Sequence, residues 1–197
     1  MTSKNHPTLF LDRDGTVNID IGPRYINDPK DASLIPGAAQ AIIRARDAGF
    51  KIALVTNQAG VAKGFTAKEN LPIVHRRIEE LIRQESGVSR FAFDDIQVCV
   101  HHPDERCKCR KPETQMLEAS IGKLGTEIER SFFVGDKSSD LICAHRMGMR
   151  SILVRTGHGN ETAEELSSLP GIEPVGIVPT LAEAVDLAIR LRDALLR

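Results

Sequence analysis

Short apolar runs along the chain alternate with longer stretches in which apolar residues recur every three or four positions. The apolar runs predict strands at residues 8–11, 51–56, 95–100, 131–135, 151–154 and, at the edge of a sheet, 175–178. The longer stretches predict helices at residues 36–49, 66–87, 114–125, 138–147 and 180–197. Strands that alternate with helices form parallel β-α-β units, so the pattern predicts an α/β fold with helices on both faces of a parallel sheet.

Local signals mark the limits of two predicted helices. Pro36 precedes the first helix and Gly49 follows it, as is typical of helix starts and ends. In the second helix, Thr66 and Glu69 have the spacing of a capping box. Pro72 lies within that helix, so we expect the regular part to begin near this residue. The chain has no internal repeat or long linker, and we expect its 197 residues to form one domain.

Polar residues follow four of the predicted strands at the point where each strand ends. They are Asp12 and Asp14 after the first strand, Thr56 and Asn57 after the second, Arg110 and Lys111 after the third, and Asp136, Lys137 and Asp140 after the fourth. The carboxyl ends of parallel strands meet at one edge of the sheet, where such folds bind their ligands. The sequence therefore predicts one site built from all four sets.

Composition and charge narrow the class of partner. Apolar residues make up 41% of the chain and charged residues 27%, which is ordinary for a globular protein. The net charge of −1 and the lack of tryptophan give no indication of a nucleic-acid or membrane partner. The first residues lack the apolar segment of a secretory signal, and no apolar run reaches membrane-spanning length. We therefore expect a cytoplasmic enzyme and, by default, a monomer.

The carboxylates of Asp12 and Asp14 are one residue apart in the stretch "DRDGT". In an extended chain such side chains point the same way, and like charges this close are costly unless a cation or a shared proton relieves them. A divalent cation such as Mg²⁺ prefers oxygen ligands, and Asp136 is placed to supply another carboxylate. The same stretch is also compatible with a simple polar glycine turn. The residues after the other strands favour the metal site.

The same residues suit phosphoryl transfer. A carboxylate can attack phosphorus and form an aspartyl phosphate that water later hydrolyses. We expect Asp12 to be this nucleophile and Asp14 to protonate the leaving oxygen and then deprotonate the attacking water. Mg²⁺, Lys111 and Thr56 would bind the phosphoryl oxygens. Two interpretations stay open for Lys137, a solvated surface lysine or a substrate contact.

A second cluster lies in the stretch "CVHHPDERCKC". Cys99, His101, Cys107 and Cys109 provide three thiolates and one imidazole, which suit a closed tetrahedral Zn²⁺ site of the structural kind. We expect zinc to fix the loop at about residues 99–112, which has little apolar material of its own. The alternative is a set of incidental cysteines. We expect the remaining cysteine to lie in the core, and His75 and His158 to have no role at the site.

Four segments, "LFLDRDGTVN", "VTNQAGVAKG", "CRKP" and "FFVGDKSSDL", resemble in order the four motifs of the haloacid dehalogenase superfamily, in its phosphatase branch. The resemblance spans roughly residues 8–157. It implies a Rossmann-like sheet of the capless type, Mg²⁺ dependence and an aspartyl-phosphate intermediate. It also implies that Asp12, the backbone carbonyl of Asp14, and Asp136 hold the metal.

Within the superfamily, the zinc loop and "CRKP" resemble a branch of phosphatases that act on heptose bisphosphates. A related branch acts on histidinol phosphate, and the loop length does not discriminate between the two. The resemblance implies that Arg110 recognises the second phosphate end of a sugar, and that the segment around Asp20 borders the substrate. Asn57, Gln58 and Lys137 are further expected substrate contacts. A small monoester as substrate, or a non-catalytic binding module, are the alternatives.

Overall fold

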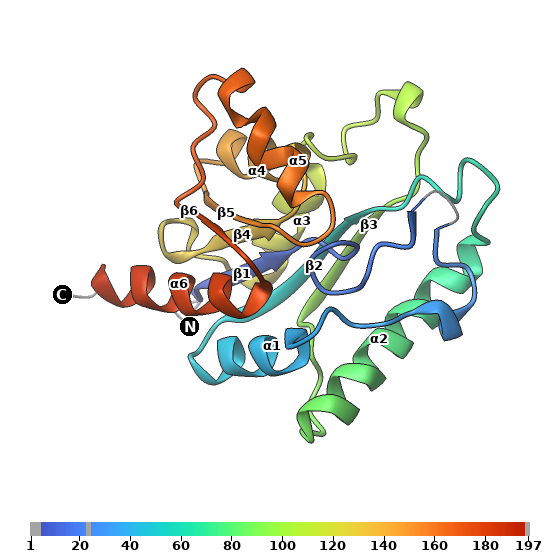
Figure 1. The fold of residues 1–197 in the computed structure, drawn as a ribbon, viewed down its shortest axis with the longest axis horizontal. Helices are drawn as coiled ribbons and strands as arrows, with labels where there is room; N and C mark the ends of the chain where they lie inside the picture. Colours follow the sequence, from blue (N-terminus) through green and yellow to red (C-terminus); the bar gives the residue numbers. More distant parts are fainter. Residues whose placement is uncertain (1–4, 23–24, 196–197) are drawn as a thin grey trace.

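The computed structural model describes residues 5–22 and 25–195. Its centre is a six-stranded, entirely parallel sheet in the order β3-β2-β1-β4-β5-β6 (Figure 1). The strands are β1 (Thr8–Leu11), β2 (Lys51–Asn57), β3 (Asp95–Cys99), β4 (Phe132–Gly135), β5 (Arg150–Val154) and β6 (Gly176–Val178). The predicted parallel sheet is confirmed, including the edge strand.

Helices cover both faces of this sheet (Figure 1). One face carries α1 (Ala38–Asp47), α2 (Leu71–Ser86) and α6 (Leu181–Ala194). The other carries α3 (Gln115–Leu124) and α4 (Ser138–Arg146), and α5 (Gly159–Glu165) follows β5. Short 3₁₀ turns lie at Pro29–Asp31 (η2), Lys68–Asn70 (η3), Pro103–Glu105 (η4), Ile128–Arg130 (η5) and Leu166–Ser168 (η6). The elements of the described residues include no separate cap domain.

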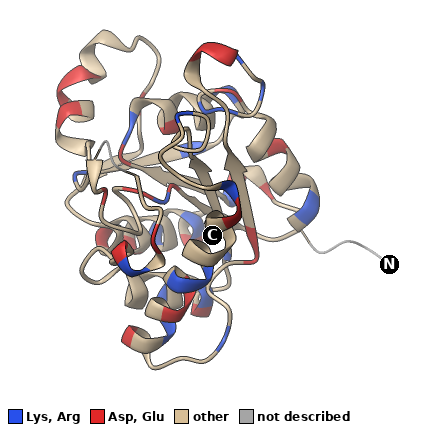
Figure 2. Cartoon of the chain, turned by 90° about the vertical axis from the view of Figure 1, so that its right-hand side faces the viewer, with Lys and Arg blue, Asp and Glu red and all other residues tan. Residues whose placement is uncertain are grey.

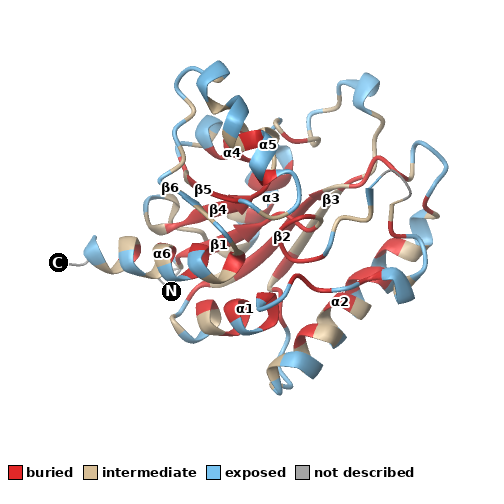
Figure 3. Ribbon diagram, viewed as in Figure 1, coloured by how far each residue is buried: buried red, intermediate tan, exposed pale blue. Residues whose placement is uncertain are grey.

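The sheet strands form the buried centre of the molecule, and the helices turn their outer faces to solvent (Figure 3). Successive side chains of β1 serve both layers, because they point to opposite faces of the sheet. Leu9 and Leu11 pack beneath α1 and α6, whereas Phe10 stacks on Phe133 on the other face with a centroid separation of 6.4 Å. Burial of β1 on both faces fixes the position of the residues that follow it.

Two local expectations need correction. The predicted capping box of the second helix is wrong: η3 precedes α2, which begins at Leu71, and the N-cap residue Asn70 makes no side-chain cap bond. Regular structure does begin next to Pro72, which occupies the first turn where its missing N–H costs nothing. Helix α5 was not predicted, because its stretch "GNETAEE" lacks apolar periodicity. No helix in the described part of the chain is long and apolar enough to cross a membrane.

The order of the strands places a crevice beside β1. From β1 the chain continues outward through β2 and β3 on one side, and later through β4, β5 and β6 on the other. Such a switch point separates the loops that follow the two central strands, and ligands of open α/β sheets bind there. Asp12 follows β1 and Asp136 follows β4, so both flank this crevice.

Candidate active site

Lys111 is the cation nearest the predicted nucleophile. Its Nζ lies 2.7 Å from Asp12 Oδ1 and 2.7 Å from Asp140 Oδ1, and it also donates to the carbonyl of Val55 at 2.7 Å. Burial of this ammonium would lower its pKa, but the charges of Asp12 and Asp140 outweigh burial and raise the pKa. Lys111 is therefore a permanent positive charge beside Asp12.

The side chain of Asn57 fixes the backbone that carries this lysine. Asn57 Oδ1 accepts from the amide of Lys111 at 3.0 Å, and Asn57 Nδ2 donates to the carbonyl of Lys111 at 3.0 Å. These two bonds tie the end of β2 to the loop that follows β3. Asn57 was expected to contact substrate. The structure shows that its amide holds the backbone of Lys111 in place.

Three carboxylates gather at the crevice. Asp12, Asp136 and Asp140 each offer an oxygen within 4.8 Å of the others. Asp136 Oδ2 accepts from the amide of His158 at 2.8 Å, but its buried Oδ1 has no hydrogen-bond partner among the described residues. Burial raises the pKa of Asp136 to about 8, and the charges of Asp12 and Asp140 add to this effect. Lys111 pairs with Asp12 and Asp140 but not with Asp136. Among the described residues, three converging carboxylates with a free Asp136 oxygen fit a divalent cation.

Two glycines let the backbone approach Asp136. A Cβ on Gly15 would lie 2.2 Å from Asp136 Oδ2, and a Cβ on Gly157 would lie 2.2 Å from the same atom and 2.5 Å from the Cα of Gly15. Both glycines have positive φ. The carboxylate of Asp136 is thus enclosed by backbone that tolerates no side chain.

Gly157→Ala is therefore expected to displace Asp136 and to lower turnover as well as stability. Gly148→Ala is the matched control: Gly148 also has positive φ, at 64°, but its Cβ would meet open space. In the control, the free energy of unfolding should fall by only about 1–2 kcal/mol, the cost of a left-handed backbone at alanine, and turnover should be unchanged. Thermal melts and turnover of both variants test this, and equal turnover in the two would show that the contact with Asp136 does not matter.

Asp14 does not belong to the three-carboxylate cluster but forms an ion pair with the buried Arg13. Arg13 Nε donates to Asp14 Oδ1 at 3.0 Å and Arg13 Nη2 donates to Oδ2 at 2.8 Å. Gln58 Nε2 donates to Asp14 Oδ2 at 2.8 Å and to Thr56 Oγ1 at 2.8 Å. Burial by itself would raise the pKa of Asp14, but Arg13 and Gln58 together lower it. Gln58 is 1% exposed, so its amide serves these neighbours and does not face the cavity.

His75 of α2 completes this buried network. Its Nε2 lies 3.3 Å from Arg13 Nη1, and burial together with the charge of Arg13 lowers the pKa of His75 to about 4. The folded protein therefore holds His75 neutral, while the unfolded chain takes up a proton below the ordinary histidine pKa. Stability from this residue is present above about pH 6.5 and is lost as the pH falls towards 4.

His75→Gln is expected to reduce the acid sensitivity of the fold. Glutamine keeps an acceptor for Arg13 but cannot titrate. Between pH 7 and pH 5, the free energy of unfolding of the parent should fall by about 2 kcal/mol more than that of the variant. Urea unfolding at the two pH values measures the difference. His145→Gln, at an exposed position of α4, is the control. Parallel pH curves for parent and His75→Gln would contradict the assignment.

A cavity of about 400 Å³ opens beside Asp14. Its walls include several residues that were expected to contact substrate; these are Asp20, Asn57, Arg110 and Lys137. Lys137 Nζ lies 3.2 Å from Asp20 Oδ2, and His158 Nε2 lies 3.5 Å from the same oxygen. Burial would lower the pKa of Lys137, but Asp12, Asp136 and Asp20 raise it. His158, which we expected to lie outside the site, is part of the cavity wall.

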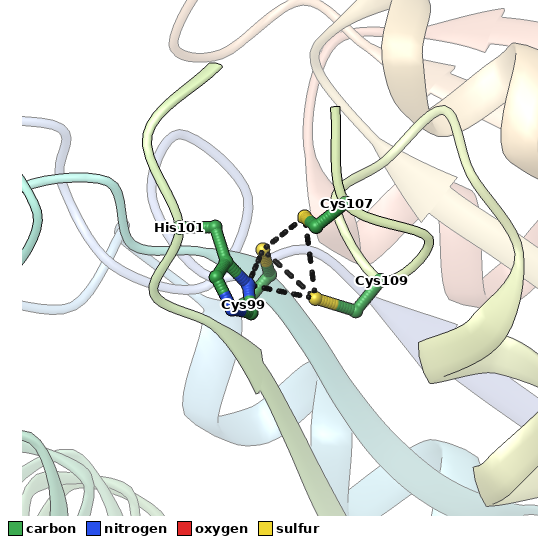
Figure 4. A group of neighbouring side chains, drawn as sticks. All are labelled: Cys99, His101, Cys107 and Cys109. Carbon is green, nitrogen blue, oxygen red and sulfur yellow. Dashed lines mark hydrogen bonds between the residues drawn. The ribbon is translucent and has the colours of Figure 1, made fainter. Parts of the chain in front are cut away.

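The four predicted zinc ligands converge at the end of β3, which supplies Cys99, and in the loop that follows it (Figure 4). Cys109 Sγ lies 3.2 Å from Cys99 Sγ, 3.5 Å from Cys107 Sγ and 3.1 Å from His101 Nδ1. In a tetrahedral zinc site, sulfur atoms about 2.3 Å from the metal are about 3.7 Å from one another, so the spacing is compatible with such an ion. Burial raises the pKa of Cys99 to about 12, so binding of a metal there would displace a proton. All four cysteines of the chain are free thiols.

Residues far from the site have the mixed character of an ordinary surface. Lysine and arginine alternate with aspartate and glutamate over the helices (Figure 2). Several form exposed pairs, such as Arg44 with Asp186. This mixture of both signs agrees with the small net charge.

Comparison with known proteins supports the motifs. A family model described as "HAD-hydrolase-like" matches residues 108–184. A D-glycero-D-manno-heptose-1,7-bisphosphate 7-phosphatase of Chlorobaculum tepidum is 42% identical over 166 residues, which cover 78% of this chain and 81% of that protein. A D-glycero-beta-D-manno-heptose-1,7-bisphosphate 7-phosphatase of Pseudomonas putida is 38% identical over 157 residues, which cover 80% and 87%.

A solved structure agrees over almost the whole chain. It is a D,D-heptose 1,7-bisphosphate phosphatase from B. bronchiseptica, complexed with magnesium and phosphate. The TM-score is 0.81 at 31% sequence identity, and the alignment covers 94% of this chain and 99% of that one. From its fold, its site residues and these relatives, the chain belongs to the haloacid dehalogenase-like phosphatases, in the family of the D-glycero-D-manno-heptose-1,7-bisphosphate 7-phosphatases.

Proposed function

We propose that the protein hydrolyses the 7-phosphate of D-glycero-D-manno-heptose 1,7-bisphosphate and releases heptose 1-phosphate for the synthesis of nucleotide-activated heptose. The observation that carries the proposal is the pairing of Asp12 with Lys111 at 2.7 Å, beside a cavity whose wall includes the cationic side chains of Arg110 and Lys137. The names of the relatives support the choice of substrate. All 197 residues would form one phosphatase domain around this site.

In the first chemical step, an Asp12 oxygen attacks the phosphorus and the bond from phosphorus to the sugar oxygen breaks. The leaving oxygen takes a proton from Asp14, and an aspartyl phosphate remains on Asp12. In the second step, water attacks this phosphorus while Asp14 takes its proton, the bond from phosphorus to the Asp12 oxygen breaks, and inorganic phosphate leaves the restored Asp12 carboxylate. An anionic phosphate beside Asp14 favours its protonated form, which offsets the effect of Arg13 before the first step.

Lys111 and Thr56 would bind the oxygens of the transferred group. Mg²⁺ would be held by Asp12, the Asp14 carbonyl and Asp136, and would supply positive charge to the phosphoryl oxygens. Asp140 shares the carboxylate cluster, and its ion pair at 2.7 Å assigns it to holding Lys111. Lys111 would then bridge Asp12 and Asp140, and the added cation would serve Asp12 and Asp136.

Arg110 and Lys137 are the candidates for the second phosphate. Both line the cavity, and Arg110 Nη1 is a buried atom without a hydrogen-bond partner among the described residues. A buried donor without a partner is costly, and an anionic ligand would satisfy it. Asp20 would accept from sugar hydroxyls, since its carboxylate faces the same cavity. Lys111 beside Asp12 is one cationic position, and Arg110 with Lys137 in the cavity wall is a second. Two such positions suit a bisphosphate better than a monoester.

A substrate panel assayed with Mg²⁺ tests this assignment. Heptose 1,7-bisphosphate should be turned over with the highest kcat/KM, ahead of hexose monophosphates and histidinol phosphate. Arg110→Gln should reduce the ratio of kcat/KM for the bisphosphate to kcat/KM for a monoester. A preference for histidinol phosphate would overturn the choice of substrate. An inert protein would instead indicate a binding module that has kept the fold.

We further propose a structural Zn²⁺ at Cys99, His101, Cys107 and Cys109. The ion would fix the loop that carries Arg110 and Lys111. Metal analysis of protein purified without chelators should find one zinc per chain, and Cys107→Ser should lose it and weaken turnover. Cys143→Ser is the control, since Cys143 is a buried thiol of α4 that is not one of the four clustered ligands. Zinc retained by Cys107→Ser, or zinc lacking in the parent, would contradict the proposal.

A further inference from the structure

Arg13 is the largest side chain with complete burial, at 0% exposure. A buried guanidinium is costly unless its donors are satisfied and its charge is paired. Here the planar fork meets the Asp14 carboxylate through Nε and Nη2, at 3.0 and 2.8 Å. The pairing is bidentate, the geometry that fixes both the position and the plane of a carboxylate.

The turn after β1 does not need this side chain. The carbonyl of Arg13 accepts from the amides of Val17 and Asn18, both at 2.9 Å, and the amide of Gly15 donates to the carbonyl of Asn18 at 2.7 Å. Backbone bonds therefore close the turn, whatever residue occupies position 13. The fully buried arginine needs another explanation.

Two residues from distant parts of the chain hold the guanidinium itself. Gln58 Oε1 accepts from Arg13 Nη2 at 2.8 Å, and Nε2 of neutral His75 accepts from Nη1 at 3.3 Å. Gln58 Nε2 in turn donates to Asp14 Oδ2 at 2.8 Å. The result is a closed ring of hydrogen bonds around one carboxylate, which leaves Arg13 no alternative position.

We propose that Arg13, held by Gln58 and His75, is a positioning residue that fixes the Asp14 carboxylate for proton exchange with the leaving oxygen. The proposal rests on the role of Asp14 in the proposed function. It also assigns the reacting atom. Oδ2 is saturated by two bonds of 2.8 Å, whereas the second contact of Oδ1 is a long one of 3.4 Å from Asn18. Oδ1 is thus the oxygen that gives up the proton as the bond from phosphorus to the sugar oxygen breaks.

The test compares kcat/KM for two leaving groups, because kcat/KM includes phosphoryl transfer to Asp12. p-Nitrophenolate leaves without a proton, whereas the alkoxide of a sugar phosphate needs one. Arg13→Met should lower kcat/KM for the sugar phosphate about 100-fold and for p-nitrophenyl phosphate less than tenfold. Asp14→Asn should show the same bias. Arg13→Lys should recover little, because lysine keeps the charge but not the fork.

Arg192→Met is the matched control, since Arg192 is also a buried arginine but packs on Phe50 far from the crevice. This variant should leave the ratio of kcat/KM for the two substrates unchanged. If Arg13→Met does not fold, His75→Leu removes one support of the guanidinium and should shift the ratio in the same direction. Loss of activity without a change in ratio would overturn the role of Arg13 if Asp14→Asn shows the bias. If Asp14→Asn lacks the bias, the role of Asp14 itself is wrong.

Discussion

Asp12→Asn is expected to lower turnover by a factor of about 10⁴ or more. An amide is too weak a nucleophile to attack phosphorus, and covalent catalysis has no substitute at this position. Asparagine has nearly the same shape, and it removes one of three carboxylates that repel one another. The variant should therefore fold normally and melt close to the parent. Steady-state assays with the best substrate, together with a thermal melt, measure both effects.

Asp104→Asn, at an exposed carboxylate of η4, is the control for the substitution. Acid-quenched parent enzyme should also yield a phosphorylated peptide that contains residue 12, which the variant should lack. Turnover of Asp12→Asn within about a hundredfold of the parent would contradict covalent catalysis by this residue. A phosphorylated peptide elsewhere in the chain would show that another residue is the nucleophile.

Lys111→Met is expected to lower turnover by a factor of about 10²–10³, the usual loss when one donor to a transferring group is removed. Methionine keeps the buried stem but deletes the ammonium that bridges Asp12 and Asp140. Without added metal, the two carboxylates then lack their cation, and the free energy of unfolding should fall by about 3 kcal/mol. Mg²⁺ should restore part of this stability but not the turnover.

The comparison with Lys123→Met separates these effects from the loss of any lysine. Lys123 pairs with Asp95 at 2.6 Å, yet its side chain is 61% exposed, so the pair should contribute under 1 kcal/mol. Chemical unfolding with and without Mg²⁺ tests stability. If Lys111→Met keeps turnover within tenfold, the lysine is a structural counter-ion and not a phosphate ligand.

Much of this architecture follows from the sequence because parallel sheets bring strand ends together. Asp12 and Asp136 follow strands that the apolar pattern identifies, so their convergence was predictable without a structure. The cluster of three cysteines and one histidine was predictable for a different reason: its residues are close in sequence, and their chemistry limits what they can bind. In both cases a local pattern carried the information.

The parts that were missed depend on contacts between distant segments. Periodicity places His75 on a helix but does not say that this helix brings it to Arg13. Gln58 was expected to contact substrate, but its amide bonds to Asp14 and Thr56 and is not part of the cavity wall. His158 follows β5 in a glycine-rich loop whose path was not readable from composition. A rule that searches every strand end for titratable groups would have found it.

The position of β1 at the switch point has a consequence for biosynthesis. β1 is synthesised before the strands that flank it: β2, the partner of one edge, follows at residues 51–57, but the partner of the other edge, β4, is made much later. Until then the nascent chain exposes unpaired backbone beside the apolar Leu9, Phe10 and Leu11, a surface prone to wrong pairing. A stalled chain that ends before β4 would therefore combine two defects: it would lack the Asp136 carboxylate, and it would be a natural client for chaperones or proteases.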